Sequence, residues 1–179
     1  TLTPLVSTHP PKIANPSLGL LKARDIKVGA SRVEEDKIRT ALEIMERARH
    51  HGVELLLPVD HVAASNFAED AKPRILADDH IADDLMGLDI GPVTRERYTE
   101  KVRNAGSLFW NGSMGVFEWD AFAKGTMAIA DAAAECAGYT VVSGGDSVAA
   151  TLAFSMGVLR MSSWRISTGV GDGSSSMIF

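Results

Sequence analysis

The sequence has a single cysteine, Cys136, and no long apolar run. One cysteine cannot form a disulfide within the chain, and this favours a reducing, cytoplasmic setting. We expect Cys136 to act as a small buried hydrophobe, since it lies in an apolar run with helical character. No run approaches the roughly 20 apolar residues of a membrane span, and no signal peptide is recognised. The sequence therefore predicts a cytoplasmic protein that does not enter membranes.

Positive charge is also scarce, because 18 Lys and Arg are outnumbered by 23 Asp and Glu, for a formal net charge of −5. Proteins that bind nucleic acid or a membrane surface normally need a basic face, so neither partner is expected. The five histidines lack metal-ligand spacing with any cysteine, which argues against a zinc site. The GxGxxG fingerprint is missing too, which disfavours a dinucleotide-binding oxidoreductase.

The chain has instead a regular alternation of helical and apolar segments from Ser31 onward. Residues 1–17 hold four prolines and are expected to form an irregular start. Ser31 and Glu34 form a capping-box pattern, which predicts a helix that ends near Gly52. Further along, we expect strands at 53–57, 107–110, 140–143 and 165–168, and an antiparallel or edge strand at 74–77. We also expect a turn-rich link at 86–92 and helices at 94–104, 122–137 and from Gly144.

Helices that alternate with short, mostly apolar strands indicate an α/β fold. We expect residues 18–179 to form a three-layer, Rossmann-like domain, with a mainly parallel sheet and helices on both faces. In such sheets, ligands bind at the carboxyl ends of the strands. Glycine-bearing loops follow three of the expected strands at that edge, at 111–118, 143–147 and 168–173. The sequence therefore predicts a ligand site where these loops meet.

The loop at 143–147 is typical of a phosphate site, because Gly144 and Gly145 allow a close backbone approach and a helix follows. Asp146 is placed to hold Mg²⁺ beside a nucleotide, and Ser147 to contact a phosphate or to cap the helix. The alternative is a tight turn in which Asp146 or Ser147 serves only as an N-cap.

The loop at 111–118 offers a second set of polar groups. Asn111, at a strand end, can donate to a transferring phosphate, and Glu118 lies where a ribose hydroxyl would need an acceptor. The alternative is a plain connection whose apolar residues are core, and for Phe117 and Trp119 we expect the core position.

Several stretches resemble the phosphoglycerate kinase family. LFWNGSMGVFEWDAFAKGTMAIADA (108–132) resembles the family's WNGPMGVFE…FAKGT signature, and VVSGGDSVAA (141–150) resembles its GGGDS/T loop. LLLPVDHVAA, DLMGLDIGP, GASRVEEDK and ISTGVG also have counterparts, in the family's order, so the resemblance covers roughly residues 19–171. The chain is identified as a member, similar to the family's C-terminal, nucleotide-binding domain.

The resemblance implies Mg-dependent phosphoryl transfer between ATP and 3-phosphoglycerate in glycolysis, by a monomeric enzyme. It implies that Glu118 binds the ribose and that Gly115 and Val116 form the adenine side. The phosphates of Mg-ATP or Mg-ADP would lie on residues 144–147, with the metal on Asp146. The transferring group would face three residues, Asn111, Gly144 and Gly169.

The sequence also departs from the family pattern. The amino-terminal domain with the 3-phosphoglycerate site, and the strand and lysine loop that contact the nucleotide phosphates, have no counterpart here. Ser113 and Ser143 replace a proline and a glycine, Arg165 replaces a histidine, and Val170 interrupts the last glycine run. We therefore expect the chain alone to bind nucleotide weakly without turnover. The alternative is a non-catalytic nucleotide-binding remnant.

Overall fold

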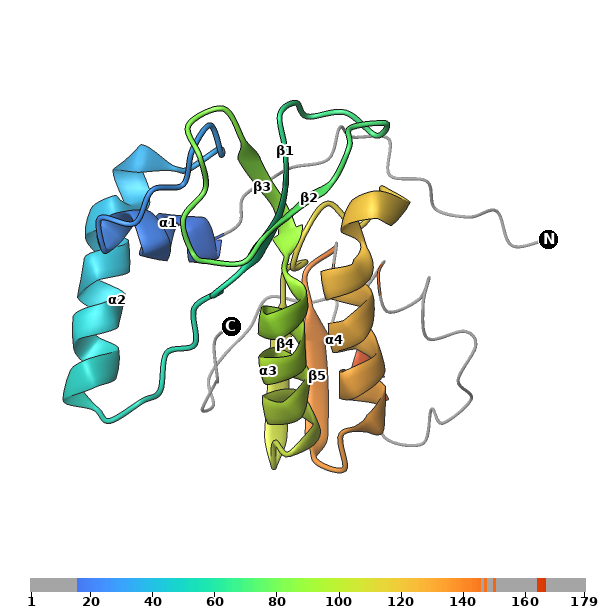
Figure 1. The fold of residues 1–179 in the computed structure, drawn as a ribbon. Helices are drawn as coiled ribbons and strands as arrows, with labels where there is room; N and C mark the ends of the chain where they lie inside the picture. The colour runs from blue at the N-terminus through green and yellow to red at the C-terminus, as the bar shows by residue number, and fades with distance from the viewer. Residues whose placement is uncertain (1–15, 146, 148–149, 151–163, 167–179) are drawn as a thin grey trace.

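The computed structural model describes residues 16–145, 147, 150 and 164–166, in which two helices precede three successive strands and helices and strands alternate from residue 92 to residue 143 (Figure 1). The helices are α1 (Pro16–Ala23), α2 (Ile38–His50), α3 (Pro92–Arg103) and α4 (Lys124–Glu135), with short 3-10 turns η1 (Glu35–Lys37) and η2 (Asp120–Phe122) before α2 and α4. The strands are β1 (His61–Ala64), β2 (Arg74–Leu76), β3 (Met86–Ile90), β4 (Ser107–Asn111), β5 (Tyr139–Ser143) and β6 (Trp164–Ile166). No helix in these ranges is long and apolar enough to cross a membrane.

The described strands form two sheets with different directions. In the order β4-β5-β6 all neighbours are parallel, whereas in the order β2-β1-β3 all neighbours are antiparallel. Helices α3 and α4 lie side by side across β4 and β5 (Figure 1). The expected α/β fold is confirmed, and the expected parallel pairing holds for β4, β5 and β6. The antiparallel sheet is a correction, because a mainly parallel sheet was expected.

Two segments differ from the sequence expectation. Residues 53–57 belong to no described strand, so the strand expected there is wrong; the carbonyl of Leu56 instead accepts a bond from the Tyr98 hydroxyl at 3.0 Å. The link expected at 86–92 is also wrong, because residues 86–90 form β3, which pairs with β1. Gly87 and Asp89 made this segment look like a turn, but both are buried in the strand.

The expected capping box is wrong as well. Helix α2 begins at Ile38, and the hydroxyl of Ser31 accepts a bond from the Gly87 N–H at 2.9 Å, which ties the preceding loop to β3. The expected end is confirmed, since α2 stops at His50 and Gly52 follows with a φ of +66°. The edge strand at 74–76, the strands at 107–111 and 139–143, and helices α3 and α4 are confirmed; of the last strand, residues 167 and 168 lie outside the described residues.

A core of large and small side chains fixes α3 and α4 against the parallel sheet. Trp110 and Val142 come from the strands, and they pack against Val102 of α3 and Ile129 of α4. Alternation in β4 places Leu108 and Trp110 on this buried side. Each such side chain contributes roughly 1.5–3 kcal/mol when fully buried. Cys136 is buried at the end of α4, as expected, with its Sγ 3.3 Å from the Ala105 carbonyl.

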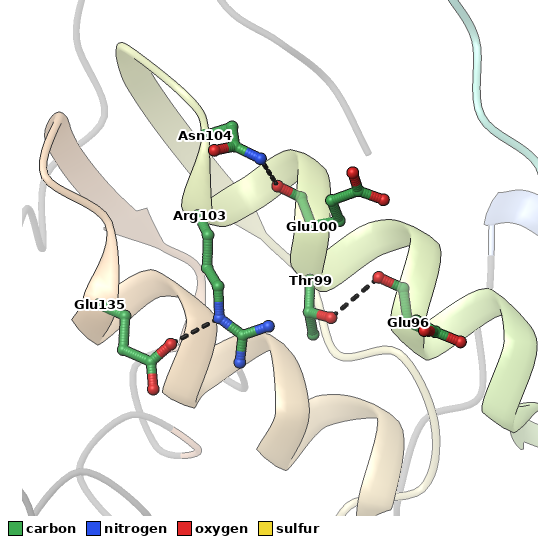
Figure 2. Close-up of polar contacts among 6 residues, drawn as sticks. All are labelled: Glu96, Thr99, Glu100, Arg103, Asn104 and Glu135. Carbon is green, nitrogen blue, oxygen red and sulfur yellow. Dashed lines mark hydrogen bonds and ion pairs between the residues drawn. The ribbon is translucent and has the colours of Figure 1, made fainter.

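The C-terminal ends of α3 and α4 are joined by an ion pair at the surface. Arg103 Nε donates to Glu135 Oε2 at 2.5 Å, and both side chains are about half exposed (Figure 2). At the same end of α3, the Asn104 side chain donates to the Glu100 carbonyl at 2.9 Å and closes the helix (Figure 2).

Candidate functional site

Two of the expected site loops meet at the carboxyl ends of β4 and β5. The parallel register pairs Asn111 with Ser143, so both strands end at the same level. Gly144 follows with a φ of +87°, and a Cβ there would lie only 2.5 Å from Asn111 Oδ1. Glycine is therefore required at position 144 both by its backbone conformation and by the close approach of Asn111.

The two loops are tied together through Gly112 and Ser147. The N–H of Gly112 donates to Ser147 Oγ at 2.5 Å, and the carbonyl of Gly112 accepts a bond from Trp110 Nε1 at 2.7 Å. The Ser147 side chain is fully buried. Because Gly112 is held from both sides, the turn after β4 has a fixed shape. The phosphate contact expected of Ser147 stays a prediction.

Beyond Gly144, the second loop opens to solvent and enters a helical segment. Gly145, Ser147 and Ala150 have helical backbone, in agreement with the helix expected to start here. Gly145 is exposed, and a Cβ built on it would meet nothing within 4 Å. Exposed N–H groups at such a start can receive an anion. Asp146 and Gly169, two further expected site residues, lie outside the described residues.

Gly115 and Val116 occupy a different position, against β3. A Cβ on Gly115 would lie 2.5 Å from Asp89 Oδ1, and the Val116 N–H donates to the Leu88 carbonyl at 2.9 Å. The Val116 side chain is buried in the core next to Leu88, whereas the Glu118 side chain is exposed. The structure thus joins Asn111, Gly144 and Ser147 directly, and it places Gly115 and Val116 further along the same loop.

A cleft of about 480 Å³ opens beside Asn111. Its wall is mainly apolar and comes from α1, α2, Leu55, Leu56 and Tyr98, while residues 111–114 form its rim. Arg32 and Lys37 add positive charge to the lining, beside one carboxylate, Glu34. This size and composition are typical of a pocket for a small molecule with a ring and a polar or anionic part.

Beneath the loop lies a buried carboxyl group, Asp89, whose side chain is 3% exposed. Its Oδ2 accepts a bond from the Gly125 N–H at 2.7 Å, and its Oδ1 accepts one from the Ile90 N–H at 2.8 Å. Burial raises the pKa of Asp89 from 3.8 to about 7, although the two N–H groups and the charges of Arg95 and Lys124 favour the ionised form.

Sequence reasoning missed both buried carboxylates of this region, Asp89 and Asp60. Asp60 accepts bonds from the N–H groups of Val93 and Thr94 at 2.8 and 2.7 Å and thereby caps α3. A signal was present, because each aspartate sits in or directly after an apolar run, where an unpartnered charge would be costly. Within the described ranges, no group of three His, Cys, Asp or Glu residues is placed to hold a metal ion.

Comparison with known proteins gives a consistent result. A family model described as phosphoglycerate kinase matches residues 17–177. The chain is similar to the phosphoglycerate kinase of Clostridium tetani, with 52% identity over 129 residues, which is 72% of this chain and 32% of that protein. It is 50% identical to the phosphoglycerate kinase of Thermosynechococcus vestitus over 154 residues, which is 84% of this chain and 38% of the relative.

The solved structures agree with these sequence matches. The structure of phosphoglycerate kinase from Coxiella burnetii superimposes with a TM-score of 0.78 at 36% identity, over 85% of this chain and 38% of that one. The chain therefore spans between 32% and 38% of the length of these relatives.

Proposed function

The chain belongs to the phosphoglycerate kinase family, and on this premise we propose that it is the nucleotide-binding part of a kinase that transfers a phosphoryl group between ATP and 3-phosphoglycerate. The observation that carries the proposal is the junction of the two glycine loops. Asn111 and Gly144 touch at the ends of parallel strands, and Gly145 faces open space beside them. This arrangement supplies room and N–H groups for a phosphate chain.

We assign the roles of the individual residues by their resemblance to the family. The exposed Asn111 amide and the Gly144 backbone flank the transferring group, with Gly169 assigned to the same group by resemblance. The backbone of Gly115 and Val116 forms the adenine side, and the exposed Glu118 carboxylate accepts from the ribose. The Val116 side chain is buried, its N–H donates to the Leu88 carbonyl and its carbonyl accepts from the Trp119 N–H, so this residue would contribute shape to the adenine side and no polar contact. Such a transfer needs positioning and charge neutralisation, and no protein nucleophile.

Magnesium fits the chemistry of the second loop. Mg²⁺ usually binds one or two carboxylates together with phosphate oxygens, so a cluster of protein ligands is not required. Asp146 is the carboxylate of the sequence segment 144–147, and the open space at Gly145 leaves room for nucleotide phosphates. When bound, the ion would neutralise phosphate charge, while this chain's residues orient the nucleotide.

The acceptor is assigned to another part of the enzyme. The 3-phosphoglycerate site would come from the family's amino-terminal domain, and turnover would require both parts, in a monomeric cytoplasmic enzyme of glycolysis. The short span of the chain relative to its relatives supports this division. We therefore expect the 179-residue chain to bind Mg-ADP or Mg-ATP weakly and to show no turnover by itself.

Calorimetric titration with Mg-ADP tests the nucleotide role. We expect weak binding by the native chain, a marked loss for Asp146→Ala and for Gly145→Val, and no change for Asp131→Ala, whose carboxylate is exposed on α4. The Gly145→Val side chain would fill the space in which the phosphates are expected. Absence of binding by the native chain would refute the nucleotide role. Measurable kinase turnover by the chain alone would refute the division into two parts.

A further inference from the structure

Asp89 lies where three elements of the fold converge. It belongs to β3, its Oδ2 receives the Gly125 N–H at the start of α4, and its Oδ1 lies against Gly115 of the loop 111–118. A Cβ on Gly125 would lie 2.1 Å from Asp89 Oδ1, so the start of α4 also approaches the carboxylate closely. The side chain thus fills the space between the loop and the helix.

The Asp89 carboxylate supplies a hydrogen-bond acceptor that α4 lacks at its N-terminus. Helix α4 begins after Ala123, which has no side-chain cap, so the early N–H groups of the helix need another acceptor. Asp89 provides it from a neighbouring strand, and the Thr126 hydroxyl of the same turn accepts a bond from the Met114 N–H at 3.0 Å. The first turn of α4 therefore holds the loop at Met114, and Asp89 holds the first turn.

We propose that Asp89 is a positioning residue whose side chain fixes the start of α4 against the loop 111–118 and so keeps that loop in its nucleotide-binding shape. The effect on nucleotide affinity rests on the proposed function. The effect on the order of the loop does not, so the two parts can be tested separately.

The charged groups around Asp89 leave its own titration as the main variable near neutral pH. Arg95 of α3 and Lys124 of α4 favour the ionised form of Asp89. On the paired strand β1, burial lowers the pKa of His61, so its charge change lies below the usual value of 6.5. The Asp60 carboxylate accepts hydrogen bonds from N–H groups at the start of α3.

The test compares the native chain with Asp89→Asn and with the control Asp131→Asn. The control changes an exposed carboxylate on α4. The readout is hydrogen-exchange protection, residue by residue, relative to unstructured amides. An Asn side chain cannot accept both the Gly125 and Ile90 bonds, so we expect roughly tenfold or greater loss of protection at Gly125 and Met114. Core amides of Trp110 and Val142 should not lose protection, and Asp131→Asn should change none of these amides.

Native protein at varied pH provides a second measurement that needs no variant. Because the folded structure raises the pKa of Asp89 to about 7, protection at Gly125 and Met114 should rise as the pH drops through that value, while Asp89→Asn stays flat over the same range. A His61→Gln variant should keep the step.

Each result decides the proposal. Unchanged protection at both amides in Asp89→Asn would overturn it, and so would an equal loss at Trp110 and Val142, because that would indicate global destabilisation. If the native chain fails to bind Mg-ADP, the proposed nucleotide role is wrong, and the protection data still decide whether Asp89 orders the loop.

Discussion

Replacing Asp89 by Asn should make the protein more stable than the native chain at pH 8, and this advantage should be lost by pH 5. Burial raises the pKa of the Asp89 carboxyl from 3.8 to about 7. The folded protein therefore holds this proton more tightly than the unfolded chain does. Such a group costs nothing below pH 3.8, and its cost grows as the pH rises until it is complete above about pH 7.

The size of the effect follows from the shift. At about 1.36 kcal/mol per pKa unit, the ionised Asp89 costs about 4 kcal/mol of folding free energy above pH 7. Asparagine removes this cost, but it leaves one of two buried N–H groups facing another donor, a loss of about 1–3 kcal/mol. The variant should thus gain about 1–3 kcal/mol at pH 8. Between pH 7 and pH 5 the native chain recovers about 2.7 kcal/mol, which cancels that gain.

Urea unfolding at pH 5, 6, 7 and 8, followed by tryptophan fluorescence, measures the difference directly. Asp131→Asn is the matched control, because it removes a carboxylate that is exposed on α4. The difference between Asp89→Asn and the native chain should change by about 2.7 kcal/mol over this range, whatever the cost of the mismatched N–H. A difference that stays constant from pH 5 to pH 8 would show that Asp89 titrates outside this range and would refute the reasoning.

Two further changes test the packing around the loop and the helix pair. Gly115→Ala should destabilise the protein by about 1–3 kcal/mol in urea unfolding, because its Cβ would lie 2.5 Å from Asp89 Oδ1. Gly106→Ala, whose Cβ would meet nothing within 4 Å, should stay within about 0.5 kcal/mol; equal effects would contradict the packing argument. For the half-exposed pair Arg103–Glu135, a double-mutant cycle should give a coupling below about 1 kcal/mol, and a value above 2 kcal/mol would contradict a surface pair.

Local patterns predicted the parallel part of the fold well. The apolar runs that form β4 and β5 are short, and each is followed by a glycine-bearing loop. Each of these runs also follows a segment that was expected to be a helix. The junction of Asn111 with Gly144 follows from these elements, because parallel strands of similar length end at one edge. The nucleotide roles assigned to these residues stay predictions.

Other features could not be read from sequence, because they depend on contacts between distant segments. Ser31 and Glu34 carry a capping pattern, but the Ser31 hydroxyl is engaged by Gly87, which is remote in the chain. Residues 53–57 have strand composition, yet a strand requires a hydrogen-bonded neighbour as well as apolar side chains. Gly87 and Asp89 suggested a turn, and only the pairing of β3 with β1 showed that both are needed inside a buried strand.

Strand β4 is the outer strand of the described parallel sheet. One of its sides bonds to β5, and the other turns its backbone N–H and C=O groups toward no described strand. An edge of this kind is a template for strand addition, and it recognises the backbone of a partner before any side chain. The same strand therefore combines two features, a loop with polar groups at its end and an unpaired edge along the side that faces no described strand. Solubility and assembly of the protein depend on what protects that side.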